Sequence, residues 1–176
     1  MWTGILIMSK TRKYHSRNFL VLSIFLFGSL AGTTTVLRSV FKLDCPFATL
    51  YRMYEYHNEH PFQYIAIVSV VFGIVGTCWI DRCSNTTGYL RWWTMTVAML
   101  LTIVISSPFG GMLWHIHDMQ HGFVPENYLG KISSGIIQGL QCGWLIGLLS
   151  MPMNLVGFIT GYLSLLYLSK LSKSHK

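Results

Sequence analysis

Histidines and carboxylates concentrate in two short segments of the chain, and the later segment has a spacing suited to metal binding. It contains His115, His117, Asp118 and His121. His117 and His121 stand four residues apart, so on a helix both imidazoles project from one face, and Asp118 lies three residues before His121. This spacing is typical of metal ligands and predicts a candidate metal site.

The earlier segment offers further ligand types, because it contains Glu55, His57, Glu59 and His60. Imidazoles and carboxylates together suit a divalent ion of zinc, copper or iron, and the carboxylates can accept hydrogen bonds from the second ring nitrogens. Both segments are predicted to face the same side of a membrane, so we expect them to form one polar site. Two other interpretations remain open: solvated histidines at a membrane interface, and histidines that ligate haem or sense pH.

Just before the later histidines, the sequence SSPFGGML at Ser106–Leu113 contains residues that disturb a helix. Pro108 removes a backbone donor, and Gly110 and Gly111 add flexibility. Irregular backbone at membrane depth persists only if it is buried in protein or lines a wet cavity. These residues, with Trp114, are therefore a candidate pocket below the histidines, and a simple helix kink is the alternative.

Glycines at strict four-residue spacing mark one face of the last apolar segment. The run consists of Gly135, Gly139, Gly143 and Gly147, and the spacing recurs in two pairs, Gly157 with Gly161 and Gly28 with Gly32. In lipid, helices associate through close backbone approach across such small residues. This glycine zipper predicts packing either against the chain's own helices or against a partner helix in a homo- or hetero-oligomer.

The composition indicates which elements position these residues. Of the 176 residues, 52% are hydrophobic and 11% are charged, against about 25% charged residues in soluble domains. Lipid is therefore the expected solvent, and residues 1–176 are predicted to form a single all-α integral membrane domain. Once the apolar segments are assigned to the membrane, too little chain remains for a second core.

Four apolar segments are long enough to cross a hydrocarbon core of about 30 Å. They are residues 19–37, 61–80, 92–114 and 132–169. The last is nearly twice the necessary length, and Pro152 must break or bend it. We expect either one kinked helix or a hairpin of two short segments, with Asn154 helping to satisfy the backbone groups that the proline leaves unpaired.

Basic residues at both ends of the chain indicate the topology. They are Lys10, Arg12, Lys13 and Arg17 at the start, and Lys170, Lys173 and Lys176 at the end. Because these residues flank apolar segments, we assign them to anionic lipid headgroups and not to nucleic acid. The positive-inside rule then predicts four spans with both termini in the cytoplasm. Cleavage of the first span as a signal peptide is an alternative.

The connection between the first two spans carries a second periodic pattern. Phe47, Leu50, Tyr51 and Tyr54 occupy positions i, i+3, i+4 and i+7, which form one helix face. Asp44, two residues before Pro46, is a helix start signal. We therefore predict a short amphipathic helix that lies in the membrane interface.

The sequence lacks the residues that several classes of membrane protein require for their function. No Asp, Glu, Lys, Arg or His side chain falls in the middle of a predicted span, where proton relays and voltage sensors usually need one. The chain also lacks a phosphate-cradling GxxxxGK motif and the zinc-protease motif HExxH. We therefore predict an accessory or structural subunit that packs into a larger membrane complex through its glycine zipper. The alternatives are a metalloenzyme or redox protein that uses the histidine and carboxylate residues, and a small transporter or channel component.

Overall fold

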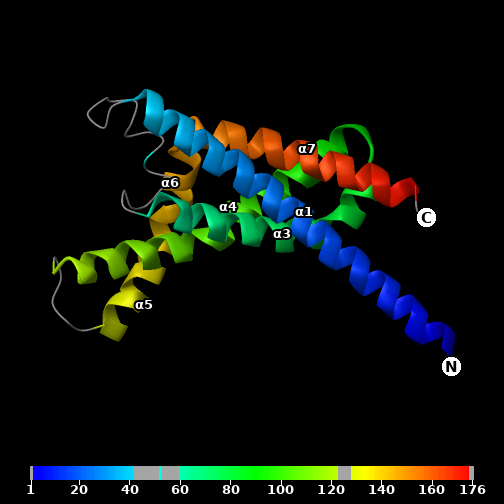
Figure 1. Ribbon diagram of the computed structural model, residues 1–176, viewed down its shortest axis with the longest axis horizontal. Coiled ribbons are helices and arrows are strands. Elements are labelled where there is room, and N and C mark those ends of the chain that lie inside the picture. Colours follow the sequence, from blue (N-terminus) through cyan, green and yellow to red (C-terminus); the bar gives the residue numbers. More distant parts are fainter. Residues whose placement is uncertain (1, 42–51, 53–59, 123–127, 175–176) are drawn as a thin grey trace.

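The computed structural model describes residues 2–41, 52, 60–122 and 128–174, and the elements in these ranges are helices (Figure 1). Within them, four helices are long and apolar enough to cross a membrane. They are α1 (Trp2–Val40, with the candidate span Tyr14–Val40), α3 (Pro61–Asn85), α4 (Gly88–Gln120) and α7 (Met153–Ser174). The predicted all-helical class with four such helices is confirmed.

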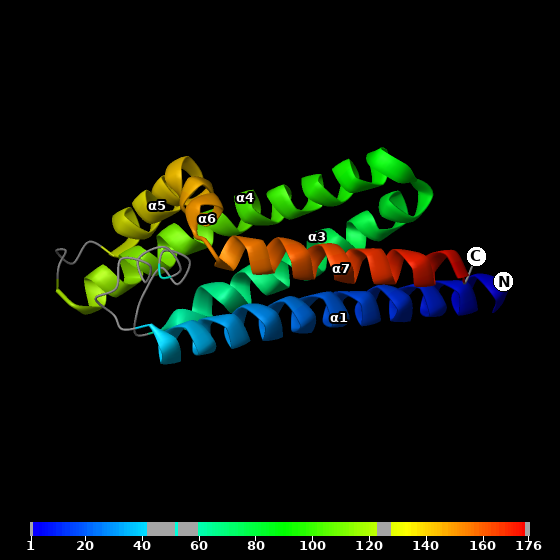
Figure 2. The same ribbon diagram turned by 90° about the horizontal axis from the view of Figure 1, so that it is seen from above.

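The four long helices lie side by side with their ends in two groups. Both chain termini and the turn between α3 and α4 lie at one end, which we call the terminal end; the end of α1, the start of α3 and the end of α4 lie at the opposite, distal end (Figure 2). The first part of α1 projects beyond the bundle (Figure 1). Gly88 opens α4 directly after the turn with φ of +56°, a conformation that glycine adopts without steric cost.

The core forms where α1, α3 and α7 meet and where α4 closes onto α3. Leu22, Leu26 and Leu30 are spaced by four residues, so they lie on one face of α1, and all three are buried. They pack with fully buried side chains from the other three helices: Tyr64, Phe72, Met95 and Leu165. Two side-chain contacts join helices inside this core, Tyr64 Oη to Ser106 Oγ at 3.3 Å and Thr34 Oγ1 to Met153 Sδ at 3.7 Å.

The helices extend beyond the predicted spans. The prediction ended the second span at Ile80, but α3 continues through Asp81 and Arg82 to Asn85. The third predicted span ended at Trp114, but α4 continues to Gln120 and so includes the later histidines. Hydrophobicity identifies only the part of a helix that suits lipid, whereas the backbone hydrogen bonds continue into the polar ends.

The apolar tract at 132–169 is not one span. It belongs to α5 (Tyr128–Gln138), a π-helical turn η2 (Gly139–Gly143), α6 (Trp144–Leu149) and then α7. The predicted break near Pro152 is confirmed, and the two parts diverge because α5 and η2 pack along α4 (Figure 2). The predicted role of Asn154 is also confirmed, since its side-chain amide donates to the carbonyl of Leu148 at the end of α6.

The predicted amphipathic helix between α1 and α3 falls on residues 42–59. The structure describes only Arg52 of this segment. This prediction therefore lies outside the described residues.

Candidate functional site

The zipper glycines of α5 and η2 contact the backbone of α4. A Cβ atom on Gly111 would collide with the carbonyl oxygen of Gly135 and would stand 2.9 Å from Cα of Gly139. A Cβ atom on Gly139 would stand 2.8 Å from Cα of Pro108. Real Cβ atoms do not approach backbone atoms so closely, so the absence of side chains on both helices is what permits this contact.

The same contact continues into α6, where a Cβ on Gly147 would lie 3.1 Å from Cγ2 of Ile103 on α4. Gly143 is buried. Gly135, Gly139 and Gly147 thus form a strip that meets this chain's own α4. Of the two interpretations of the zipper, packing within the chain accounts for Gly135, Gly139 and Gly147.

The two glycine pairs outside the zipper differ from each other. A Cβ on Gly161 would lie 2.6 Å from Cε of Met99, so this glycine allows α7 to approach α4 closely. Gly157 has room for a side chain, because a Cβ atom there would lie 3.7 Å from Cδ2 of Leu30, an ordinary van der Waals distance. Gly28 and Gly32 on α1 have no described atom within 4 Å of their Cβ positions.

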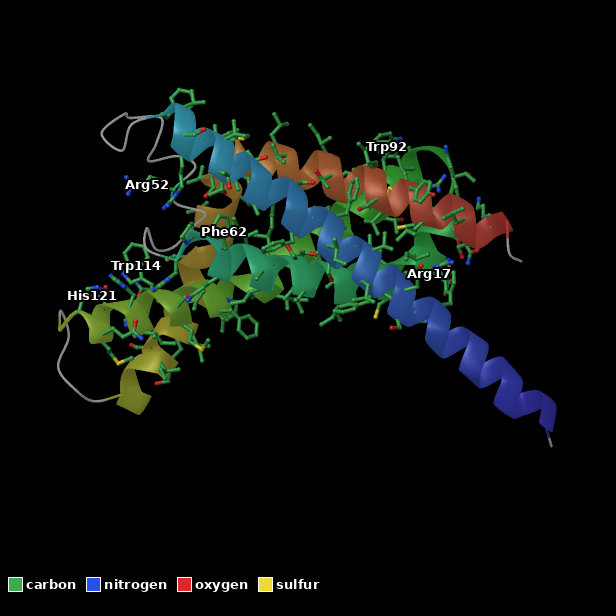
Figure 3. The ribbon with its side chains drawn as sticks, viewed as in Figure 1. Arg17, Arg52, Phe62, Trp92, Trp114 and His121 are labelled. Atoms are coloured by element: carbon green, nitrogen blue, oxygen red, sulfur yellow. The ribbon has the colours of Figure 1, made fainter. Side chains whose placement is uncertain are left out.

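The predicted pocket residues lie on a continuous helix. Although Pro108 has no N–H to donate to the Val104 carbonyl, the Ser107 hydroxyl donates to that carbonyl at 2.8 Å. Gly110 and Gly111 are buried, and the backbone of α5 and η2 occupies the space beside Gly111. Trp114 is half exposed, near the distal end of α4 (Figure 3).

His115 connects α4 to α5. Its Nε2 atom lies 3.1 Å from Oε1 of Gln138, and its ring also covers Gly135, whose Cβ position is 2.6 Å from Cδ2 of His115. The Nδ1 atom of His115 is buried and has no hydrogen-bond partner among the described residues. This histidine therefore fixes α5 against α4 at the distal end.

His117 and His121 lie together as the four-residue spacing predicts. Their ring centroids are 3.9 Å apart with the planes inclined by 41°, and Nδ1 of His121 is 3.1 Å from the His117 carbonyl oxygen. His121 is at the far end of α4 (Figure 3). Asp118 is half-buried on the same turn.

The wider metal site remains a prediction. Glu55, His57 and Glu59 lie outside the described residues, and His60 is exposed directly before α3. Within the described ranges, no three or more His, Cys, Asp or Glu side chains are grouped closely enough to hold a metal ion. A shared site would therefore need ligands from residues 55–59.

Two features were not predicted from the sequence. Gly73 and Gly76 let α3 approach α1, since a Cβ on Gly76 would lie 2.7 Å from Cδ1 of Leu22; their three-residue spacing was a usable signal. Arg91 at the start of α4 donates a hydrogen bond to Ser169 on α7. No local pattern indicates that contact, because 78 residues separate the two side chains.

No protein-family model, curated protein or solved structure matches the chain.

Proposed function

We propose that this protein is an integral membrane protein whose α1, α3, α4 and α7 cross the bilayer, with both termini on the cytoplasmic side. The length and apolar character of these helices support the proposal. At about 1.5 Å per residue, even α7, the shortest, exceeds a hydrocarbon thickness of about 30 Å.

The charge distribution supports the orientation. Nine of the thirteen lysines and arginines belong to the terminal segments and to the helix ends that flank the α3–α4 turn: Lys10, Arg12, Lys13, Arg17, Arg82, Arg91, Lys170, Lys173 and Lys176. Asp81 is the single acidic residue in the same parts of the sequence. The other five carboxylates belong to the end of α4 or to the connections that join helices at the distal end. This asymmetry favours a cytoplasmic terminal end and contacts with anionic lipid headgroups there.

Tags at the two termini test this orientation. An external protease added to intact cells should cleave neither tag, and it should cleave both after permeabilisation. Cleavage of the C-terminal tag alone on intact cells would contradict an even number of spans.

Within the membrane, we propose that the protein acts as an accessory or structural subunit that binds a partner transmembrane helix on α1. The observation that carries this proposal is the open glycine pair, because Gly28 and Gly32 are exposed and meet no described atom within 4 Å. Gly135, Gly139, Gly147 and Gly161, in contrast, lie in close contacts between helices of this chain.

The remaining properties of α1 suit the same role. Only 22% of its apolar window is buried within the chain, against 56% for α3. The hydroxyl groups of Ser29, Thr33 and Thr35 donate to carbonyls of α1 itself, at 2.7 to 2.8 Å, so they need no hydrogen-bond partner on another helix. A partner can therefore approach the α1 backbone through van der Waals contact alone.

Leucine substitutions test the docking face. Gly28→Leu and Gly32→Leu should abolish association, measured by native mass spectrometry after mild-detergent purification, while the thermal stability of the isolated chain stays unchanged. Val36→Leu is the matched control, because Val36 is exposed and already large. An unchanged set of bound partners with both glycine substitutions would contradict the proposal.

A further inference from the structure

Arg91 is held in an unusual setting at the terminal end. It lies in the first turn of α4, and its Nη2 atom donates to the hydroxyl oxygen of Ser169 on α7. The Ser169 hydroxyl donates in turn to the Leu166 carbonyl at 2.9 Å, and Ser169 is fully buried. The Ser169 hydroxyl therefore accepts a hydrogen bond from the guanidinium and donates one to the α7 backbone, which holds the guanidinium in place.

The guanidinium has no anion to balance it among the described residues. Its Nε atom is buried without a hydrogen-bond acceptor, although Arg91 is only partly buried as a residue. A cation in the first turn of a helix also faces the positive end of the helix dipole. Burying part of a charge without a partner costs free energy, so the site favours an added anion.

A second buried donor lies nearby on α7. The Tyr162 hydroxyl has no hydrogen-bond partner among the described residues, and the Tyr162 ring stacks on Trp92, which directly follows Arg91 in α4. Buried polar groups are nearly always hydrogen-bonded in native proteins. Two donors on neighbouring helices that both lack an acceptor among the described residues favour an added acceptor at this place.

The surroundings indicate what carries that acceptor. The Trp92 ring stacks on Tyr162, with centroids 4.2 Å apart and planes inclined by 22°, and 56% of the Trp92 surface is exposed beside α7 (Figure 3). Tyr89 and Trp93 are exposed on the same turns of α4. Such an aromatic group is typical of the headgroup level of a bilayer. Lys170 directly follows Ser169 in α7, is exposed, and places a second positive charge at the same end of the bundle.

We propose that Arg91, Tyr162 and Lys170 bind the phosphate group of an anionic phospholipid in the leaflet at the terminal end, with Ser169 as a positioning residue and the Trp92 ring against the lipid's glycerol region. Arg91 supplies charge-assisted N–H donors to the phosphate oxygens, and the free N–H groups of the first turn of α4 favour the same charge. The placement of this lipid in the cytoplasmic leaflet rests on the proposed orientation, whereas the binding site itself does not.

Native mass spectrometry of the full chain in mild detergent tests the site. Titrated phosphatidylglycerol should bind with higher affinity than phosphatidylcholine, and Arg91→Gln should weaken phosphatidylglycerol binding by roughly tenfold. Arg82→Gln is the matched control, because Arg82 carries the same charge at the same end of the bundle but is exposed. Its Cζ atom lies 4.5 Å from the centroid of the Trp79 ring. The control substitution should weaken binding by no more than roughly threefold.

Tyr162→Phe keeps the proposal testable if Arg91→Gln fails to fold. It removes a buried hydroxyl that has no described partner, so the lipid-free protein should remain as stable as the wild type, while the affinity for phosphatidylglycerol falls. Unchanged lipid affinity with Tyr162→Phe and with a folded Arg91→Gln would overturn the site and leave a buried water as the acceptor.

Inorganic phosphate distinguishes the source of the ligand. Thermal protection by millimolar inorganic phosphate equal to that by phosphatidylglycerol would overturn the lipid assignment in favour of a soluble phosphate. Lipid binding in detergent does not depend on which side of a bilayer the site faces. A negative lipid-binding result would therefore contradict the lipid site alone, and a negative tag result would contradict the proposed orientation alone.

Discussion

Gly111 of α4 and Gly135 of α5 touch through their backbones. A Cβ atom on Gly111 would collide with the Gly135 carbonyl oxygen, and one on Gly135 would stand 2.7 Å from the Gly111 carbonyl oxygen. Because the restriction is reciprocal, neither helix can accept a side chain at this crossing without moving. The contact explains how α5 and η2 lie flat against α4 in the apolar tract before Pro152.

Gly111→Ala should therefore destabilise the protein. A methyl group that meets backbone, and not a flexible side chain, should cost about 1–3 kcal/mol of the free energy of unfolding in detergent micelles. Gly157→Ala is the matched control, because its Cβ would lie at an ordinary 3.7 Å from Leu30. It should be neutral or stabilising, since alanine is favoured over glycine in a helix by about 1 kcal/mol. Equal stabilities of the two variants would contradict the close crossing.

Gln138→Leu should loosen α5 without affecting the rest of the bundle. The substitution removes the acceptor that lies 3.1 Å from Nε2 of His115, and the expected loss is about 0.5–1 kcal/mol because Gln138 is exposed. Hydrogen exchange should accelerate in α5 and stay unchanged in α1. Gln141→Leu, an exposed glutamine one turn later, is the control. Equal acceleration by both substitutions would show that the His115 contact does not hold α5.

The sequence predicts the long helices well because lipid imposes a simple requirement, about twenty apolar residues without charge. The break at Pro152 and the role of Asn154 were also predictable, since a missing N–H has local consequences. The partner of the zipper was not predictable. Spacing shows that Gly135 and Gly139 share a face, but it does not show that α4 meets that face.

The same limit applies to the polar sites. The pairing of His117 with His121 follows from helix periodicity, because four residues bring side chains onto one face. The contact of Arg91 with Ser169 depends on how α4 and α7 pack, and nothing near either residue in the sequence specifies it. Long-range contacts of this kind require the tertiary arrangement.

Asn154→Leu should destabilise the turn between α6 and α7. The Leu148 carbonyl would lose the donor that the Asn154 amide provides, and an unsatisfied carbonyl in an apolar setting costs about 1–3 kcal/mol. Thermal unfolding in detergent measures this effect. Ser164→Ala is the control, because the Ser164 hydroxyl bonds within its own helix, to the Gly161 carbonyl at 2.9 Å, and its loss should cost less. A destabilisation by Ser164→Ala as large as that by Asn154→Leu would remove the special role of Asn154.

The last prediction concerns the metal site at the distal end. His117 and His121 present two imidazoles with ring centroids 3.9 Å apart. Two ligands bind zinc, copper or iron weakly, because stable zinc sites use three or four protein ligands. We therefore expect metal binding only if Glu55, His57 or Glu59 completes the set.

Protein purified without chelator should then contain stoichiometric metal by elemental analysis. His117→Ala combined with His121→Ala should remove it, and Glu55→Gln with His57→Ala should reduce it strongly. His15→Ala is the control, because this exposed histidine lies on α1 near the terminal end. Metal content that survives the double histidine substitution would exclude the pair as ligands. Metal content that is lost with that pair but unchanged by the substitutions at residues 55 and 57 would exclude Glu55 and His57 as ligands and leave Glu59 and His60 as the candidates from this segment.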